Sequence, residues 1–301
     1  MFSSPYRFIF EILQNADDAE YSSETIPCLT FRVRPQELLI ESNQKDFTVA
    51  NVKAICATNQ SSKTGNDGTT GEKGIGFKSV FGIATVVHIR SGFWSFRFEH
   101  RRGQNGIGMI TPLWTDPEVL PPHVRTRFRL QYHPQPKQNF LKDLAEEFEK
   151  IPDSVLFATR QVTMLKIVFE RVAGRQYSVL FKREGSVEEG EFRITRCTFG
   201  QGEQSERVTQ EAIFKVHQAT IFDLPPRTVE ALPAGEVRND NESEITLGFQ
   251  VDDDNNPIVP ELGQYTFAFL PIERLAYMPV STHCHLSCRK APLTLAVPRA
   301  R

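Results

Sequence analysis

Long hydrophobic runs are missing from this sequence of 301 residues, and so is a strong net charge. No apolar stretch approaches the ~20 residues that a membrane-spanning helix needs, so we expect no contact with the membrane interior. The formal net charge is −2, from 35 basic and 37 acidic residues, which gives no sign of an electrostatic nucleic-acid binder. The apolar fraction of 40% suffices for real cores, and the length allows about two domains.

Cysteine is also scarce, and its scatter excludes the disulfide framework of a small secreted protein. No signal peptide is visible, so we expect a reducing compartment, either the cytosol or the nucleus. The last two cysteines belong to a cluster whose spacing would suit a soft metal ion: His283, Cys284, His285 and Cys288. No second ligand cluster accompanies it, as structural zinc sites usually require, so we interpret the cluster as coincidence.

The first informative stretch is residues 5–21, PYRFIFEILQNADDAEY, which we predict to be a helix. Apolar residues recur on one stripe of it, at positions 8, 12, 16 and 19. Glu11, Asn15 and Asp18 share a second face beside that stripe. This polar triad is either a solvated edge or a site that combines a base for water, a magnesium ligand and a polar orienter.

The second informative stretch is residues 71–81, GEKGIGFKSVF, with glycines just before a helical pattern. Glycines let backbone amides approach phosphates closely, and a helix N-terminus favours anions. The stretch is almost a P-loop, but Phe77 separates the last glycine from Lys78, and no apolar strand leads into it. The polar residues at 58–73 are either a disordered loop or an ATP lid. Lys63 and Lys73 are candidates for phosphate contact.

Together, E-x-x-x-N-A-x-D-A and G-x-x-G-x-G-F-x-S-x-F resemble the Bergerat-type ATP-binding fold. Heat-shock chaperones of ninety kilodaltons, gyrase B, MutL and the histidine kinases share that fold. The more specific resemblance is to the sacsin-like and NO VEIN-like group of plant and fungal proteins. The segments that carry it are RFIFEILQNADD (7–18), NVKAIC (51–56), SSK (61–63), GEKGIGFKSVF (71–81) and IGMITPLW (107–114).

The resemblance implies an α+β fold class in two parts. Residues 1–158 are expected to form a two-layer α/β sandwich with a mixed, largely antiparallel sheet, carrying a lid at about 58–73. Residues 159–301 are expected to form a β-rich second domain, because alternating apolar stretches replace helical patterns there. Relatives carry more chain before the first helix, and the tail departs from the group's pattern, so truncation stays an open alternative.

The resemblance also implies ATP and Mg²⁺ as cofactors and gives each candidate residue a role. Glu11 is the expected catalytic residue, which orients and deprotonates the attacking water. Asn15 is the expected magnesium ligand. Charge on the phosphates is expected to be stabilised by the backbone amides of Gly74, Ile75, Gly76 and Phe77.

The adenine end is expected to involve Asp18, Asn43 and Thr126. Asn43 stands where the fold usually has aspartate, and an amide can accept a hydrogen bond from the adenine amino group. Asp46 replaces a usual glycine, at some cost if that position needs a positive φ. Thr126 alternates with a row of arginines and is predicted to point inward, so a structural hydrogen bond is an equally weighted interpretation.

The expected function is ATP binding with slow Mg-dependent hydrolysis, as in the heat-shock-chaperone-like ATPase superfamily. Two alternatives stay open: a non-hydrolytic, nucleotide-gated interaction module, and a degenerate scaffold that binds no nucleotide. The expected partners are a nucleotide and an unidentified protein partner or client. By resemblance, Arg289 is a candidate for contact with the γ-phosphate.

Overall fold

The computed structural model describes residues 6–57, 77–100, 106–134, 136, 138–200, 207–221, 243–258, 264–268, 270–275 and 285–288. The chain divides into two compact units. The first contains residues 2–184 and 194–211, and the second is built mainly from residues 185–193 and 212–301.

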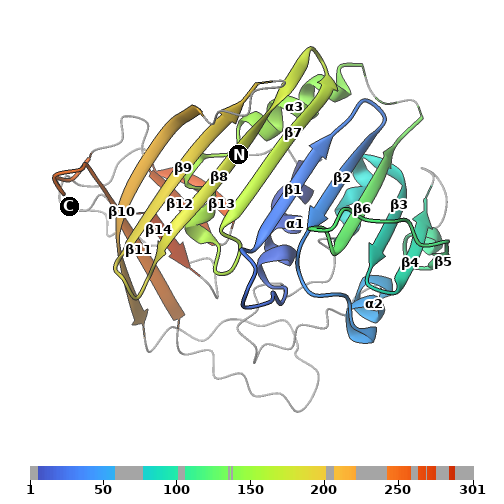
Figure 1. Cartoon of the computed structure of the whole chain (residues 1–301), viewed down its shortest axis with the longest axis horizontal. Coiled ribbons are helices and arrows are strands. Elements are labelled where there is room, and N and C mark those ends of the chain that lie inside the picture. The colour runs from blue at the N-terminus through green and yellow to red at the C-terminus, as the bar shows by residue number, and fades with distance from the viewer. Residues whose placement is uncertain are drawn as a thin grey trace, which may run out of the picture. The chain divides into compact units, whose positions relative to one another are not determined.

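One mixed β-sheet forms most of the first unit (Figure 1). Its strands are β1 (Cys28–Val33), β2 (Glu37–Ser42), β3 (Ala84–Ser91), β4 (Trp94–Glu99), β5 (Leu113–Trp114), β6 (Thr126–Tyr132), β7 (Met164–Val172), β8 (Arg175–Ser186) and β9 (Glu191–Phe199). They lie side by side in the order β9-β8-β7-β1-β2-β6-β3-β4-β5. Of the pairs whose register is described here, β1–β7 runs parallel and the others antiparallel.

Strand β1 pairs with one strand that is close to it in the sequence and one that is distant in the sequence. A tight turn joins it to β2, where the backbone amide of Arg34 donates to the carbonyl of Glu37 at 3.0 Å, so the predicted hairpin is confirmed. On its other side β1 pairs with β7, and Phe31 is level with Ile167. Both side chains are buried, so an apolar strand from the second half of the sequence completes the surroundings of β1.

The helices pack on one face of this sheet. The helical elements are α1 (Phe8–Asp17), α2 (Val49–Cys56), α3 (Phe140–Glu149) and the 3-10 segments η2 (Phe77–Gly82), η3 (Gly106–Met109) and η4 (Asp153–Ala158). Helix α3 is anchored by ring contacts of Phe148 with Phe31 at 5.1 Å and of Phe140 with Tyr132 at 5.0 Å. The apolar residues of β1, β2 and β6 therefore face the helices.

The opposite face of the same strands carries ion pairs. Arg127 on β6 donates to Glu41 on β2 at 2.5 Å, and the Glu41 side chain is only 4% exposed. Arg129 likewise donates to Glu37 at 2.6 Å. Burial would raise the pKa of Glu37, but Arg129 and Arg34 outweigh it and hold that pKa below its usual value. The predicted alternation of arginines on one face of residues 124–132 is confirmed.

In the second unit, β10 (Arg207–Ile221) pairs antiparallel with β11 (Ser243–Val251). Further strands are β12 (Gln264–Ala268), β13 (Leu270–Leu275) and β14 (His285–Cys288), in the order β13-β12-β14-β11-β10. The prediction that this half of the sequence is rich in strands is therefore confirmed.

The predicted fold class is wrong. The structure is mostly a large mixed sheet with few and short helices, and it is not a two-layer α/β sandwich of the Bergerat type. The reason is that β7 and β8 do not start a sheet of their own. Instead β7 pairs with the free edge of β1, and the sheet continues through it. Whether residues 1–158 form a domain stays a prediction.

Two smaller predictions also need correction. The first helix begins at Phe8 and ends at Asp17, so it is shorter than the predicted 5–21. The segment after the glycines is a 3-10 helix, Phe77–Gly82, where a longer helical pattern was predicted. None of the described helices has the length and apolar character needed to cross a bilayer.

Candidate functional site

Helix α1 is buried on nearly every side, and two polar residues form the remaining strip. Eight of its ten residues are buried, and the two exceptions are Glu11 and Asn15. They lie one turn apart, on the same side of the helix. The Glu11 side chain is 21% exposed and accepts a hydrogen bond from Nε of Arg7 at 3.2 Å. We call Glu11 and Asn15 the polar strip.

The segment that follows the glycine motif packs against this helix. Residues of η2 contact residues of α1, although about 60 residues separate them in the sequence. Phe77 opens η2, and its ring packs on Phe128 of β6 at 5.7 Å between centroids. The two sequence stretches that carry the resemblance therefore lie against each other at this point.

Lys78, the next residue, connects three elements. Its ammonium group donates to the carbonyl of Ile55 at the end of α2 and to the carbonyl of Met109 in η3. It also lies over the ring of Phe98, 4.8 Å from the centroid. Burial lowers the pKa of Lys78 to about 8, and Cys56 opposes that shift. In the sequence this lysine stands out only as a P-loop-like residue, and the structure gives it a bridging position.

Three buried hydroxyl residues lie in register across β2, β6 and β3. They are Ser42, Thr126 and Ser91, which we call the hydroxyl row. The hydroxyls of Ser91 and Thr126 are hydrogen-bonded at 2.7 Å, and Ser91 also accepts from the backbone amide of Phe47 at 3.0 Å. Thr126 thus points inward as predicted, and it makes the structural hydrogen bond that was its alternative interpretation.

Tyr21 connects the hydroxyl row to the end of α1. Its hydroxyl donates to the carbonyl of Ala16 at 2.9 Å and lies 3.5 Å from Oγ of Ser42. Burial raises the pKa of Tyr21 to about 12. The sequence motifs do not single out Tyr21, Ser42 or Ser91. For the two serines the period-2 alternation of the strands was the signal that could have found them.

Asn43, another residue predicted at the adenine end, hydrogen-bonds to the backbone at and before the start of β1. Its side-chain oxygen accepts from the backbone amide of Cys28 at 2.9 Å, and its amide group donates to the carbonyl of Ile26 at 2.8 Å. Asp46 is not among the described residues with positive φ, so the conformational cost considered for it does not arise. It forms a bidentate ion pair with Arg125.

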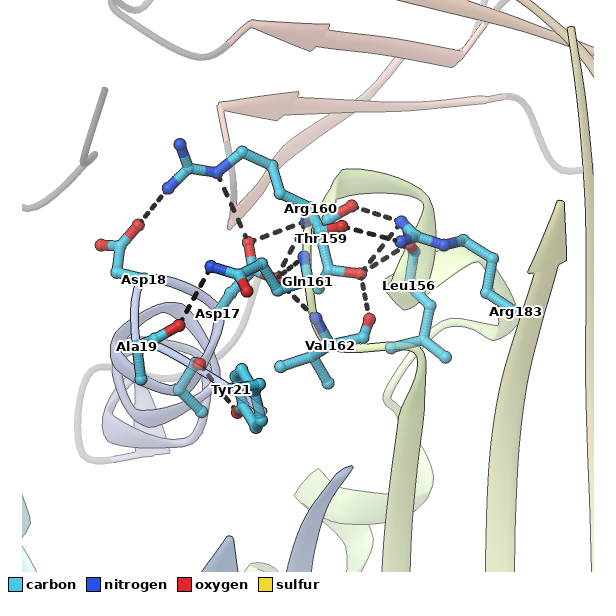
Figure 2. Close-up of polar contacts among 11 residues, drawn as sticks. Asp17, Asp18, Ala19, Tyr21, Leu156, Thr159, Arg160, Gln161, Val162 and Arg183 are labelled. Carbon is cyan, nitrogen blue, oxygen red and sulfur yellow. Dashed lines mark hydrogen bonds and ion pairs between the residues drawn. The ribbon is translucent and has the colours of Figure 1, made fainter. Parts of the chain in front are cut away.

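Both aspartates at the end of α1 hold Arg160, which lies in the segment before β7 (Figure 2). Oδ1 of Asp17 accepts from the backbone amides of Arg160, Gln161 and Val162 at 2.8–2.9 Å. Asp18 accepts from Nη2 of Arg160 at 2.5 Å. Burial raises the pKa of Asp17, while these amides lower it. No role for Asp17 is predicted from the sequence, because its partners lie more than 140 residues away.

Of the predicted site residues, the structure places Glu11, Asn15 and Asp18 on or at the end of one helix, with Phe77 on the element packed against it. Thr126 pairs in register with Ser42, and Tyr21 connects Ser42 to the end of that helix. Asn43 is turned toward the loop before β1. Lys63, Lys73, Gly74, Ile75, Gly76 and Arg289 lie outside the described residues.

The described part of the chain contains no group of three or more His, Cys, Asp or Glu side chains that could hold a metal ion. Of the cluster at 283–288, His283 and Cys284 lie outside the described residues. Cys28, Cys56 and Cys197 form no disulfide bond.

Comparison with known proteins gives one partial similarity. No protein-family model matches the chain. The chain is similar to Protein NO VEIN of Arabidopsis thaliana, with 39% identity over 123 residues, which are 41% of this chain. The matched part spans only 4% of the length of that protein. This similarity supports the resemblance to the NO VEIN-like group that the motifs indicate. It covers only the matched 123 residues of the chain.

Proposed function

We propose that the chain binds Mg-ATP between α1 and the glycine-rich segment 71–77, and that it hydrolyses the nucleotide slowly. Its assignment to the histidine kinase-like and heat-shock-chaperone-like ATPase superfamily is part of this proposal. The observation that carries it is the contact between α1 and η2. This contact brings the helix with Glu11 and Asn15 to the segment that follows the glycines.

The polar strip supports a role in holding the phosphates. On a helix that is otherwise buried, an amide and a carboxylate lie together on the unburied side. Mg²⁺ on a nucleotide usually takes one or two protein ligands and keeps phosphate oxygens and waters as the others. The side-chain amide oxygen of Asn15 would supply such a ligand. Bound there, Mg²⁺ would neutralise phosphate charge.

Glu11 is the proposed general base. It lies one turn before Asn15 and is part-exposed, so a water could reach its carboxylate. Arg7 is positioned to orient that carboxylate through its 3.2 Å hydrogen bond. Thr126, with Ser42 and Tyr21 beside it, supplies hydroxyl groups at the proposed adenine end.

Two substitutions on α1 test the proposal. Asn15→Ala is expected to abolish the Mg-dependent part of ATP binding, measured by calorimetric titration with and without Mg²⁺. Asn15→Asp keeps an oxygen ligand and is expected to retain it. Glu11→Ala is expected to bind ATP as well as the wild type does but to lose phosphate release by ~10²-fold or more, because a general base contributes 10²–10⁴-fold.

Glu146→Ala is the matched control for Glu11→Ala, because it removes a part-exposed carboxylate from another helix, α3. Both binding and phosphate release should be unchanged in it. If phosphate release is undetectable in the wild type while ATP still binds, the proposal of a slow ATPase is wrong, and a non-hydrolytic, nucleotide-gated interaction module takes its place.

One observation favours the degenerate scaffold as a second candidate. Asp18 and Asn43, two of the residues predicted at the adenine end, already hydrogen-bond to groups of the chain itself. The scaffold predicts no heat and no thermal shift with millimolar Mg-ATP in the wild type.

A further inference from the structure

Asn43, the residue that the sequence predicts as the acceptor for the adenine amino group, is bound to the chain through both ends of its amide. Its side-chain oxygen accepts from the backbone amide of Cys28 at 2.9 Å. Its nitrogen donates to the carbonyl of Ile26 at 2.8 Å. Both polar groups of this side chain are thereby committed to the backbone at and before the start of β1.

Asp18, the second residue predicted at the adenine end, is paired and covered. Its side chain is 1% exposed and accepts from Nη2 of Arg160 at 2.5 Å, as Figure 2 shows at the end of α1. Separating a buried carboxylate from its guanidinium leaves an uncompensated charge, which is strongly unfavourable. The contacts of Asp18 therefore join α1 to the segment before β7, and a base would gain little by displacing them.

The hydroxyl groups at the same end are bound to one another and to the backbone. Thr126 is hydrogen-bonded to Ser91 at 2.7 Å, and neither residue has measurable exposure. Ser42 accepts from the backbone amide of Gln44 at 3.1 Å. The Tyr21 hydroxyl donates its proton to a carbonyl of α1 at 2.9 Å. These hydroxyls can line a site without selecting what enters it.

Reading a base by hydrogen bonds requires buried donors or acceptors whose partner is that base. An analogue without the matching group is rejected because those atoms are then left unpaired. Within the described part of the chain, the buried side-chain atoms that have no hydrogen-bond partner all belong to other residues. None of them belongs to Asp18, Asn43, Thr126, Ser42 or Ser91. The residues predicted at the adenine end thus lack what discrimination between bases needs.

The proposed phosphate contacts are of a different kind. Asn15, on the unburied side of α1, is the proposed ligand of Mg²⁺, and backbone amides of the glycine-rich segment are the proposed donors. Their targets are a metal ion and phosphate oxygens, which are the same in every nucleoside triphosphate. Affinity that comes from these contacts does not depend on the base.

We propose that the site selects the Mg-triphosphate group and does not distinguish adenine from other purines, so that its substrate class is purine nucleoside triphosphates and not ATP alone. The inference rests on the proposed function, because it assumes that the phosphates bind between α1 and the glycine-rich segment. It differs from the degenerate scaffold, which binds no nucleotide.

The test measures the Kd of the full wild-type chain for Mg-ATP, Mg-GTP and Mg-ITP by calorimetric titration in one buffer. The three purine rings are alike in size but carry different donors and acceptors at their edges, so stacking is held nearly constant. We expect the three Kd values to agree within about threefold, whereas hydrogen bonds from buried groups to one base would separate them on the order of tenfold or more.

Asn43→Ala tests the residue that the sequence predicts as the base acceptor. The ratio of its three Kd values should equal that of the wild type, even if loss of the bonds to Ile26 and Cys28 weakens all three. Asn15→Ala is the matched control, because it removes the same amide group from the phosphate side and should weaken Mg-dependent binding of all three alike. Thermal melting of each variant shows that it is folded before its Kd values are interpreted.

The outcomes separate this inference from the proposed function. If the wild type prefers any one of the three nucleotides by more than the expected margin, indifference to the base is overturned and the proposed function stands. Folded Asn43→Ala that weakens Mg-ATP alone would overturn it in the same way. If the wild type binds none of the three at millimolar concentration, the proposed function fails and the inference fails with it. The wild-type comparison decides the question even if Asn43→Ala does not fold.

Discussion

At the scale of single residues, the structure shows Thr126 in the structural one of its two interpretations. Its hydroxyl lies in the interior, where the sequence predicts it, but its partner there is Ser91. Neither hydroxyl has measurable exposure. A buried hydroxyl that loses its partner costs about 1–3 kcal/mol. The Ser91–Thr126 bond therefore contributes to stability whether or not a nucleotide binds beside it.

Thr126→Val is expected to lower the free energy of unfolding by about 1–3 kcal/mol, because it keeps the shape and leaves Ser91 without that partner. The measurement is urea denaturation followed by fluorescence. Thr115→Val is the matched control, since it breaks the part-buried hydroxyl pair of Ser95 and Thr115. Its cost should be below that of Thr126→Val, and equal costs would contradict the argument from burial.

At the scale of secondary-structure elements, two side chains hold helices in place. Arg175 of β8 donates to both oxygens of Glu149 at 2.7 and 2.8 Å, at the end of α3. The hydrogen bond from Arg175 holds the pKa of Glu149 below its usual 4.5, with burial opposing and Tyr177 assisting. Lys78 similarly connects η2 to α2 and η3.

Arg175→Gln is expected to cost about 0.5–1 kcal/mol at neutral pH, because both partners are part-exposed. A carboxyl group whose pKa is lowered on folding stabilises the fold at pH values above its pKa in the unfolded chain. That stabilisation is lost as the pH falls through its pKa in the folded protein. The difference between wild type and variant should therefore shrink below pH 4.5, the ordinary value for glutamate. Lys142→Gln, which breaks an exposed pair on the same helix, should show a smaller difference.

The stability difference between the wild type and Lys78→Met should also increase with pH, but in the alkaline range. The folded pKa is about 8 and the ordinary value is 10.5, so between them the unfolded chain binds more protons. The wild type should gain stability relative to Lys78→Met as pH rises from 8 to 10.5. Urea denaturation across this range measures the difference, and a constant difference would contradict the assigned environment of Lys78.

Local patterns predicted the elements well and the long-range pairings poorly. Alternation gave β1 and β2 and the inward side of β6, and helical spacing gave α3. Helix spacing gave the shared face of Glu11 and Asn15. The contact between the two motif segments was within reach only through the family resemblance. The pairing of β7 with β1 was not, since any apolar strand can extend a free edge. Asp17 was missed for the same reason, as its amide partners are distant in sequence.

At the scale of the whole molecule, the position of β7 makes a break at residue 158 unfavourable. Such a fragment would lose the parallel neighbour of β1 and the buried apolar residues Leu165, Ile167 and Phe169. The amides that Asp17 binds would also be absent. We expect residues 1–158 alone to aggregate or to unfold without a cooperative transition, as judged by size-exclusion chromatography and thermal melting.

A fragment that ends at residue 211 is the matched control, because it retains every residue of the first unit. It should be monodisperse and melt cooperatively. A stable, cooperatively folding 1–158 fragment would instead support the domain boundary that the sequence predicts.

The parallel pairing of β1 with β7 also affects how the protein folds during its translation. Val33 ends β1 and Met164 begins β7, so about 130 residues must be translated between them. At about 5–20 residues per second, that takes roughly 7–26 seconds. During this interval the nascent chain presents an apolar strand with one open edge, which is the kind of surface that ribosome-associated chaperones shield.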